Sequence, residues 1–380
     1  MPLALVAVAA LVWLWPGGVV TEQRDPAQRP QRFTADVVTV VEQPCPPRPE
    51  GAPAGGLAGT FRCGSVTIQL TDGPDRGKRV DTEIPGGPGA PTLRAGDHVV
   101  VLFLPDSLSG RPYQVIDHQR SKPLLALALA FVFAVVAFGR WRGLRALAGL
   151  AVTFSVLLLF IVPAILNGQS PLLVAIVGAA VTMLSVLFLT HGFNLTTAIA
   201  VLGTLASLTV TGVLSATSTW ATRLTGVASE EASFLNVAFQ DVNMQGLLLA
   251  GILIGSLGVL DDVCVTQAAT VTELARANPE LSYGQTYQAA TRIGRAHIAS
   301  VINTIILAYA GASLPLLILL AAGDQPVGEL LTSQFLAEEI VRSAVGTIGL
   351  ITAVPITTAL AALAARPLSL RADSVAPRRW

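Results

Sequence analysis

Charged residues are scarce in this sequence. Of its 380 residues, 24 are Lys or Arg and 24 are Asp or Glu, so 13% of the chain is charged while 52% is hydrophobic. A soluble protein carries about 25% charged residues and has no place to put so much apolar surface away from water. The composition therefore excludes an ordinary soluble domain and indicates a membrane protein in a lipid bilayer. The net charge of zero implies no nucleic acid or other polyanion as a partner.

Several motifs of enzymes and cofactor-binding proteins are also missing. The glycine-rich run PGGPGAP at residues 85–91 does not fit GxxxxGK[ST], and the chain has neither HExxH nor GxSxG. His98 and His118 lack a partner at the spacing of a metal site. We therefore expect no catalytic constellation, no metal and no cofactor. Any transport would be passive, coupled to an ion or powered by a partner protein.

Cysteine is equally rare, and no CxxC pair occurs. Cys45 and Cys63 share one polar region, whereas Cys264 stands alone in another. This division predicts a disulfide between Cys45 and Cys63 outside the cytoplasm and one unpaired thiol. Two free thiols at these positions are the alternative.

Long apolar runs are what the sequence has in abundance. A transmembrane helix needs roughly 20 apolar residues, and eight stretches qualify. They are Leu3–Val20, Leu124–Gly139, Leu144–Leu166, Leu172–Leu189, Leu195–Ser218, Met244–Leu260, Ile298–Ala321 and Ile340–Ala364. The sequence therefore predicts an α-helical polytopic membrane protein with about eight spans. Residues 1–20 are interpreted as an anchor helix; if they are instead a cleaved signal segment, seven spans remain in residues 122–366.

The basic residues of the short loops predict the orientation. Ten arginines lie in alternate loops, in the tail at residues 367–380 or directly before that tail. They are Arg140, Arg142, Arg145, Arg276, Arg292, Arg295, Arg366, Arg371, Arg378 and Arg379. The remaining short loops hold only Arg223. Because Lys and Arg stay on the cytoplasmic side of a membrane, both termini are expected in the cytoplasm and residues 21–121 outside it.

Residues 21–121 follow a different period. The runs FTADVVTVVEQPC (33–45), FRCGSVTIQL (61–70) and GDHVVVLFLP (96–105) are rich in β-branched residues and separated by Gly, Pro and Asp. Such runs predict a small antiparallel barrel or sandwich, and the OB type, in which five strands close on themselves, is one form that it would take. Residues 111–123 would supply its last strand and the connection to the next span. This segment would dock a protein partner or bind a ligand.

One polar stretch interrupts the apolar runs. Asp261 and Asp262 follow a predicted span, and one interpretation is that an acidic residue here caps the next helix. In the other interpretation the helix continues, and Asp262, Thr266, Thr270 and Glu273 form one polar stripe with Gln267 beside it. A second helix then carries Arg292, Arg295, His297 and Asn303. Charged side chains near lipid need partners or water. The acidic residues of the first helix and the basic residues of the second, at the cytoplasmic boundary of the membrane, would therefore form either a clamp between the two helices or the mouth of a water-filled path.

The same stretch carries a family resemblance. The run GVLDDVCVTQAATVTEL (Gly258–Leu274), followed by RIGRAHIASVINTIILAYAGASLPLLILL (Arg292–Leu320), resembles the YibE/F-like family of bacterial multi-pass membrane proteins. The resemblance extends from the strand-rich segment, through YQVIDHQR (Tyr113–Arg120), to the last span. It departs at Cys264, where the family has a small or hydroxyl residue. It implies a bacterial inner-membrane location and about eight spans, but no mechanism.

Three functions are consistent with these features. The first is a transporter or permease for a small solute or an ion. The second is a non-catalytic scaffold or accessory subunit that docks a partner through its extracytoplasmic segment. The third, an intramembrane enzyme, would use Asp262 and Glu273 as acid and base, and it requires an environment that separates their pKa values. The sequence favours the first two over an enzyme.

Overall fold

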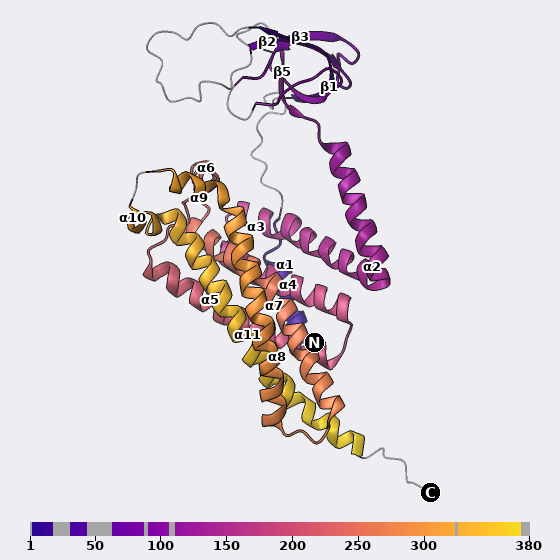
Figure 1. The fold of residues 1–380 in the computed structure, drawn as a ribbon, viewed down its shortest axis with the longest axis vertical. Helices are drawn as coiled ribbons and strands as arrows, with labels where there is room; N and C mark the ends of the chain where they lie inside the picture. Colours follow the sequence, from indigo (N-terminus) through magenta and orange to yellow (C-terminus); the bar gives the residue numbers. More distant parts are fainter. Residues whose placement is uncertain are drawn as a thin grey trace. The chain divides into compact units, whose positions relative to one another are not determined.

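A computed structural model of the chain describes residues 2–17, 31–43, 63–86, 90–105, 111–323 and 326–373. The chain divides into two compact units (Figure 1). The strand unit comprises Thr21–Ala134, and the helical unit comprises Met1–Val20 together with Val135–Trp380. Each unit is described by itself.

The strand unit contains a five-stranded antiparallel sheet with the order β3-β2-β1-β4-β5. Its strands are β1 Gln31–Gln43, β2 Cys63–Leu70, β3 Arg79–Glu83, β4 His98–Phe103 and β5 Tyr113–His118. Residues 31–36 of β1 pair with β4 and residues 35–43 pair with β2, and a register shift between Val37 and Thr39 interrupts the pairing with β2. A bulge of this kind bends a strand. β3 and β5, at the two edges of the sheet, also contact each other.

Alternate residues of these strands form the core of the unit. Val66 and Ile68 of β2 and Val99 and Val101 of β4 are fully buried, because side chains of a strand point to opposite faces in turn. The predicted strand runs are therefore confirmed as strands. The sequence reasoning missed β3, a five-residue strand whose sequence RVDTE is dominated by charge.

The helical unit contains most of the chain. Its elements, with α2 shared between the units, are α1 Pro2–Trp13, α2 Ser121–Val156, η2 Leu157–Ile161, α3 Val162–Leu166, α4 Pro171–His191, α5 Leu195–Ala221, α6 Glu230–Ala238, α7 Met244–Ala277, α8 Tyr283–Ala312, α9 Leu314–Ala321, α10 Val327–Leu331 and α11 Gln334–Asp373. Among the described residues, six helical stretches are long and apolar enough to cross a membrane. This confirms a membrane protein with several apolar helices, whereas eight spans remain a prediction.

The count differs from eight for two local reasons. The first predicted span contains only the 12-residue helix α1, which is short for a membrane crossing. The predicted spans 124–139 and 144–166 belong to one helical stretch, Ser121–Leu166. This stretch is interrupted at Arg140, where φ is 49° and ψ is −128°. The turn expected between the two spans is therefore present as a sharp break in backbone conformation.

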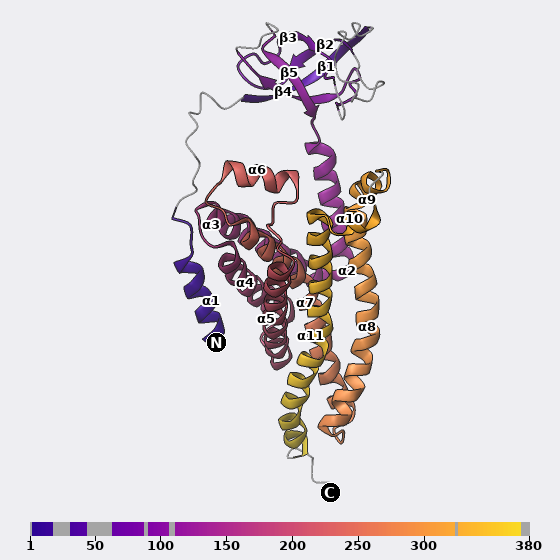
Figure 2. The same cartoon turned by 90° about the vertical axis from the view of Figure 1, so that its left-hand side faces the viewer.

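Four helices form the centre of the helical unit. α5, α7 and α11 pack against one another, and α8 packs against α7 and α11 (Figures 1 and 2). Gly349 of α11 lies against the Thr211 side chain of α5, and Gly203 of α5 lies against the Thr357 side chain of α11. A Cβ atom at either glycine would collide with these threonines. Small residues at a helix crossing let two backbones approach closely, so the α5–α11 contact depends on them.

Candidate functional site

The helix α7 runs without a break through the pair Asp261 and Asp262. It begins at Met244, ends at Ala277 and contains 34 residues. No helix begins at either aspartate, so the capping interpretation is wrong, and the helix continues as the alternative required. At about 1.5 Å per residue, α7 is about 51 Å long, longer than the roughly 30 Å hydrocarbon core of a bilayer.

The two aspartates face different surroundings, because neighbouring residues of a helix are rotated by about 100° from each other. Asp262 is exposed. Asp261 turns toward α5, and its Oδ1 atom is buried with no hydrogen-bond partner. The sequence pattern places Asp262 on the polar stripe, whereas in the structure it is Asp261 that faces the interior.

Polar side chains from three helices surround Asp261. The hydroxyl of Thr204 on α5 lies beside the Asp261 carboxylate. Thr204 and Ser207 of α5 both lie beside Cys264, which follows Asp261 by one turn of α7. From α11, the Thr357 hydroxyl donates a hydrogen bond of 3.3 Å to the Cys264 Sγ atom. We refer to these five residues as the Asp261 cluster.

Three oxygen atoms of the Asp261 cluster lack a hydrogen-bond partner among the described residues. They are Asp261 Oδ1, Thr204 Oγ1 and Ser207 Oγ. Thr204 and Ser207 are fully buried. Buried polar atoms are nearly always hydrogen-bonded, and each exception needs an explanation such as a water or an ion. Three exceptions on adjoining helices indicate a place where something polar binds.

A row of hydroxyl groups continues from the cluster along one face of α5. After Thr204 and Ser207 come Thr211, Ser215 and Thr219, each at most 1% exposed. Thr211 donates to the Ser207 carbonyl at 2.9 Å, and Ser215 donates to the Thr211 carbonyl at 2.7 Å. The recurring spacing of three or four residues places them on the side of α5 that faces α11. In this direction the helix interface is closed.

In the other direction, α5, α7 and α11 enclose a cavity of about 660 Å³. Its lining includes Ala200, Val265 and Ala361, each four residues from a member of the Asp261 cluster on the same helix. Four residues span about 6 Å of helix. On all three helices the cavity therefore reaches to within about one turn of the cluster. Near its other end are polar residues that include His191, Asn194 and Arg276.

The other predicted site residues lie mostly on the surface of α7 and α8. Asp262, Glu273, Arg292, Arg295 and Asn303 are exposed, and His297 is half-buried. Glu273 pairs with Arg276 of its own helix at 2.9 Å.

The acid–base clamp between the two helices does not form. Among the described residues, no ion pair joins an acid of α7 to Arg292 or Arg295. The polar stripe is present, but as an exposed face of a helix longer than the bilayer core. Asp262 and Glu273 are separated by eleven residues, about 16 Å along the helix, and so cannot act together on one bond as the enzyme hypothesis required.

Gln267 is the one predicted polar residue that links helices. It is 3% exposed, and its Nε2 atom donates to the Ala290 carbonyl of α8 at 3.0 Å and to the Thr358 hydroxyl of α11 at 2.7 Å. Gly294 of α8 makes room for it, because a Cβ atom there would lie 2.6 Å from Gln267 Oε1. Gln267 therefore joins α7, α8 and α11 one and a half turns beyond Asp261.

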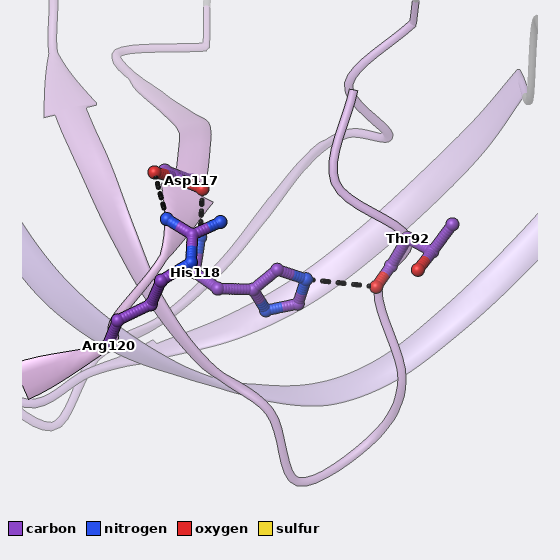
Figure 3. Close-up of polar contacts among 4 residues, drawn as sticks. All are labelled: Thr92, Asp117, His118 and Arg120. Carbon is purple, nitrogen blue, oxygen red and sulfur yellow. Dashed lines mark hydrogen bonds and ion pairs between the residues drawn. The ribbon is translucent and has the colours of Figure 1, made fainter. Parts of the chain in front are cut away.

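In the strand unit, polar contacts gather where β5 ends and α2 begins (Figure 3). Arg120 turns back onto Asp117, with Nη1 2.5 Å from Oδ2. This contact, with the His118 backbone N–H, lowers the pKa of Asp117, and the carboxylate raises the pKa of Arg120. The His118 ring reaches the Thr92 carbonyl, with Nε2 3.1 Å from the oxygen. These contacts hold the last strand in place.

One further prediction and one further contact concern this unit. Cys63 is disulfide-bonded, and Cys45, its predicted partner, lies outside the described residues. Tyr113 of β5 donates a hydrogen bond of 2.8 Å to Asp75. Burial, and then this hydrogen bond to a carboxylate, raises the pKa of Tyr113 to about 12.

Comparison with known proteins bears on the helical unit. The family model described as YibE/F-like protein matches residues 127–367, which is more than half of the chain and includes the whole Asp261 cluster. The match begins within α2, after the five strands and after Tyr113–Arg120, to which the predicted resemblance had extended. No curated protein and no solved structure matched the chain.

Proposed function

The chain belongs to the YibE/F-like family, and from this premise we propose that it is a secondary transporter that moves a small polar solute or an ion through its helical unit. The proposal places the protein in the bacterial inner membrane with both termini in the cytoplasm. The proposed functional site is the Asp261 cluster and not the polar residues at the predicted cytoplasmic boundary of the membrane.

One observation carries this proposal. The cavity between α5, α7 and α11 ends about one helical turn from a buried carboxylate and two buried hydroxyls that lack partners. Thr204 is the tenth of 27 residues of α5, so the cluster lies about 14 Å along that helix, within the depth of a membrane. Ionisable residues such as Asp261 are rare at this depth, and they mark pathways of solutes, ions or protons.

The arrangement has the form expected of one state of an alternating-access cycle. Transporters of this kind hold their site near the middle of the membrane and open it to one side at a time. Here the cavity opens toward residues 191–194 and 276–279, which the basic loops predict to be cytoplasmic. The hydroxyl row from Ser207 to Thr219 closes the other side. We interpret this as an inward-open state.

The strand unit has a separate part in the proposal. We propose that it is an OB-like barrel of five strands; the pairing of β1 with both β2 and β4 and the contact of β3 with β5 support this. We propose that this barrel docks a protein partner outside the cytoplasm. In the alternative function, a scaffold, docking is the whole role of the chain and Asp261 is dispensable.

A strain comparison tests the transporter against the scaffold. A deletion strain is complemented with the wild-type gene, with Asp261→Asn or with Asp262→Asn, and cellular solutes and ions are measured together with protein levels. We expect Asp261→Asn to reproduce the deletion and Asp262→Asn to restore wild-type contents to within about twofold. Full restoration by Asp261→Asn at normal protein level would contradict the transporter and favour the scaffold.

A further inference from the structure

The Asp261 carboxylate has no positively charged partner inside the bundle. An unpaired ionised carboxylate in a low-dielectric interior costs several kcal/mol, and the usual solutions are a partner of opposite charge or a bound ion. Among the described residues, no Lys, Arg or His forms an ion pair with Asp261. The charge therefore has to be balanced by something that the chain itself does not supply.

The helices packed against α7 place no positive charge beside Asp261 in the part of the chain that the structure describes. α5 presents Thr204 and Ser207 and has no ionisable residue, while α11 presents Thr357. The only ionisable residue of α4 is His191 at its end, which lines the cavity. Arg292 and Arg295 of α8 are exposed. The site thus has one formal negative charge, which matches one positive charge.

The oxygen atoms distinguish a bound ion from a bound proton. A protonated carboxyl group has a single O–H donor, so it satisfies one acceptor. Three oxygens from two helices lack a partner within normal hydrogen-bond geometry. The Thr204 hydroxyl lies beside the carboxylate, and Ser207 lies beside Cys264, one turn further along α7. A cation placed among these oxygens would provide a partner for all of them at once. Carboxylate and hydroxyl oxygens are hard ligands, which suit alkali and alkaline-earth ions rather than soft metals.

We propose that Asp261, Thr204 and Ser207 bind one monovalent metal cation, with sodium as the first candidate. A divalent ion is disfavoured because calcium and magnesium sites in proteins use more carboxylates or several waters, and only one carboxylate is present here. The cavity gives the ion a route to within about one turn of its ligands. The inference rests on the proposed transporter function and names its coupling ion.

Binding is tested on the purified full-length protein in detergent at pH 8. The midpoint of thermal unfolding is measured against NaCl, KCl and choline chloride at constant ionic strength. For the wild type we expect a saturable rise in midpoint with Na⁺ and none with choline, because a ligand that binds only the folded state stabilises it. Asp262→Asn, which changes the neighbouring exposed carboxylate, is the matched control and should keep the rise.

Two variants address the ligands. Asp261→Asn should abolish the Na⁺ dependence, because an amide has no charge. Thr204→Val keeps the charge and nearly the same shape, so it covers the case in which Asp261→Asn does not fold; we expect it to weaken Na⁺ binding at least tenfold. Wild-type midpoints that do not saturate with Na⁺ or K⁺, or an unchanged Na⁺ response in Thr204→Val, would overturn the site.

The two proposals fail in different ways. If Na⁺ binds as described but Asp261→Asn restores the deletion strain fully, the cation site stands and transport is wrong. If Asp261→Asn reproduces the deletion but no alkali cation stabilises the wild-type protein, transport stands and the cation site is wrong.

Discussion

Polar side chains on the two faces of α7 have opposite surroundings. On the exposed face, Asp262 and Glu273 lie beyond the packed interior, and Glu273 is neutralised by Arg276 of the same helix. On the buried face, Asp261 and Gln267 contact α5 and α11. Exposed pairs of this kind contribute about 0–1 kcal/mol, whereas buried polar groups are costly unless they are satisfied. The number of charges in this stretch is therefore less informative than the direction in which each side chain points.

The largest effect on stability is expected in the buried contact between α5 and α11, where small residues let the two helices approach closely. In Gly349→Ala a new Cβ atom meets the Thr211 side chain, whereas in Gly346→Ala, three residues earlier on α11, it meets open space. Overpacking a tight interface costs about 1–3 kcal/mol. We expect Gly349→Ala to lower the thermal unfolding midpoint in detergent by several degrees and Gly346→Ala to leave it unchanged. Equal midpoints would show that the α5–α11 contact is looser than described.

A smaller effect is expected at Gln267. Gln267→Leu removes both hydrogen bonds that join α7 to α8 and α11, which we expect to cost about 1–2 kcal/mol. Glu273→Gln, on the exposed face of the same helix, should cost at most about 0.5 kcal/mol. Unfolding of both variants by detergent titration gives the comparison. If Glu273→Gln were the more destabilising, the exposed face would be the one that holds the helices together.

The smallest effect concerns the strand unit and is visible in the pH dependence of its free energy of unfolding. The pKa of Tyr113 is about 12 in the folded protein and about 10 in an unfolded chain. Between these values the unfolded chain loses a proton that the folded protein keeps, so the free energy of unfolding falls as pH rises from 10 to 12. Tyr113→Phe should cost about 1 kcal/mol at neutral pH and should reduce this fall. Hydrogen exchange of the strand amides measures both; an identical pH profile in the variant would contradict the Tyr113–Asp75 account.

Much of the fold follows from local patterns in the sequence. The apolar runs predict α4, α5, α7 and α11, and the alternating runs predict β1, β2 and β4. These predictions are possible because the spacing of apolar residues can be read within a single helix or strand. β3 is too short and too charged to show such a period. The break at Arg140 lies where three arginines predict a turn.

The Asp261 cluster depends on more than one helix, and this explains why it was missed. Whether Asp261 or Asp262 points inward depends on which neighbours pack against α7, and no local pattern contains that information. The available signal was the hydroxyl spacing of Thr204, Ser207, Thr211, Ser215 and Thr219 along one face of a predicted span. Combined with one of two adjacent aspartates, this spacing would have identified α5 as the partner.

The central claim is that a cavity from the predicted cytoplasmic side reaches the Asp261 cluster and stops there. Labelling of single introduced cysteines with a membrane-impermeant maleimide, in vesicles of both orientations, tests it most directly. We predict that Ala200→Cys reacts from the cytoplasmic side only, as does Asn278→Cys in the loop after α7, while Thr211→Cys reacts from neither side. Reaction of Thr211→Cys but not of Ala200→Cys, or reaction of Ala200→Cys only from the opposite side, would contradict the account.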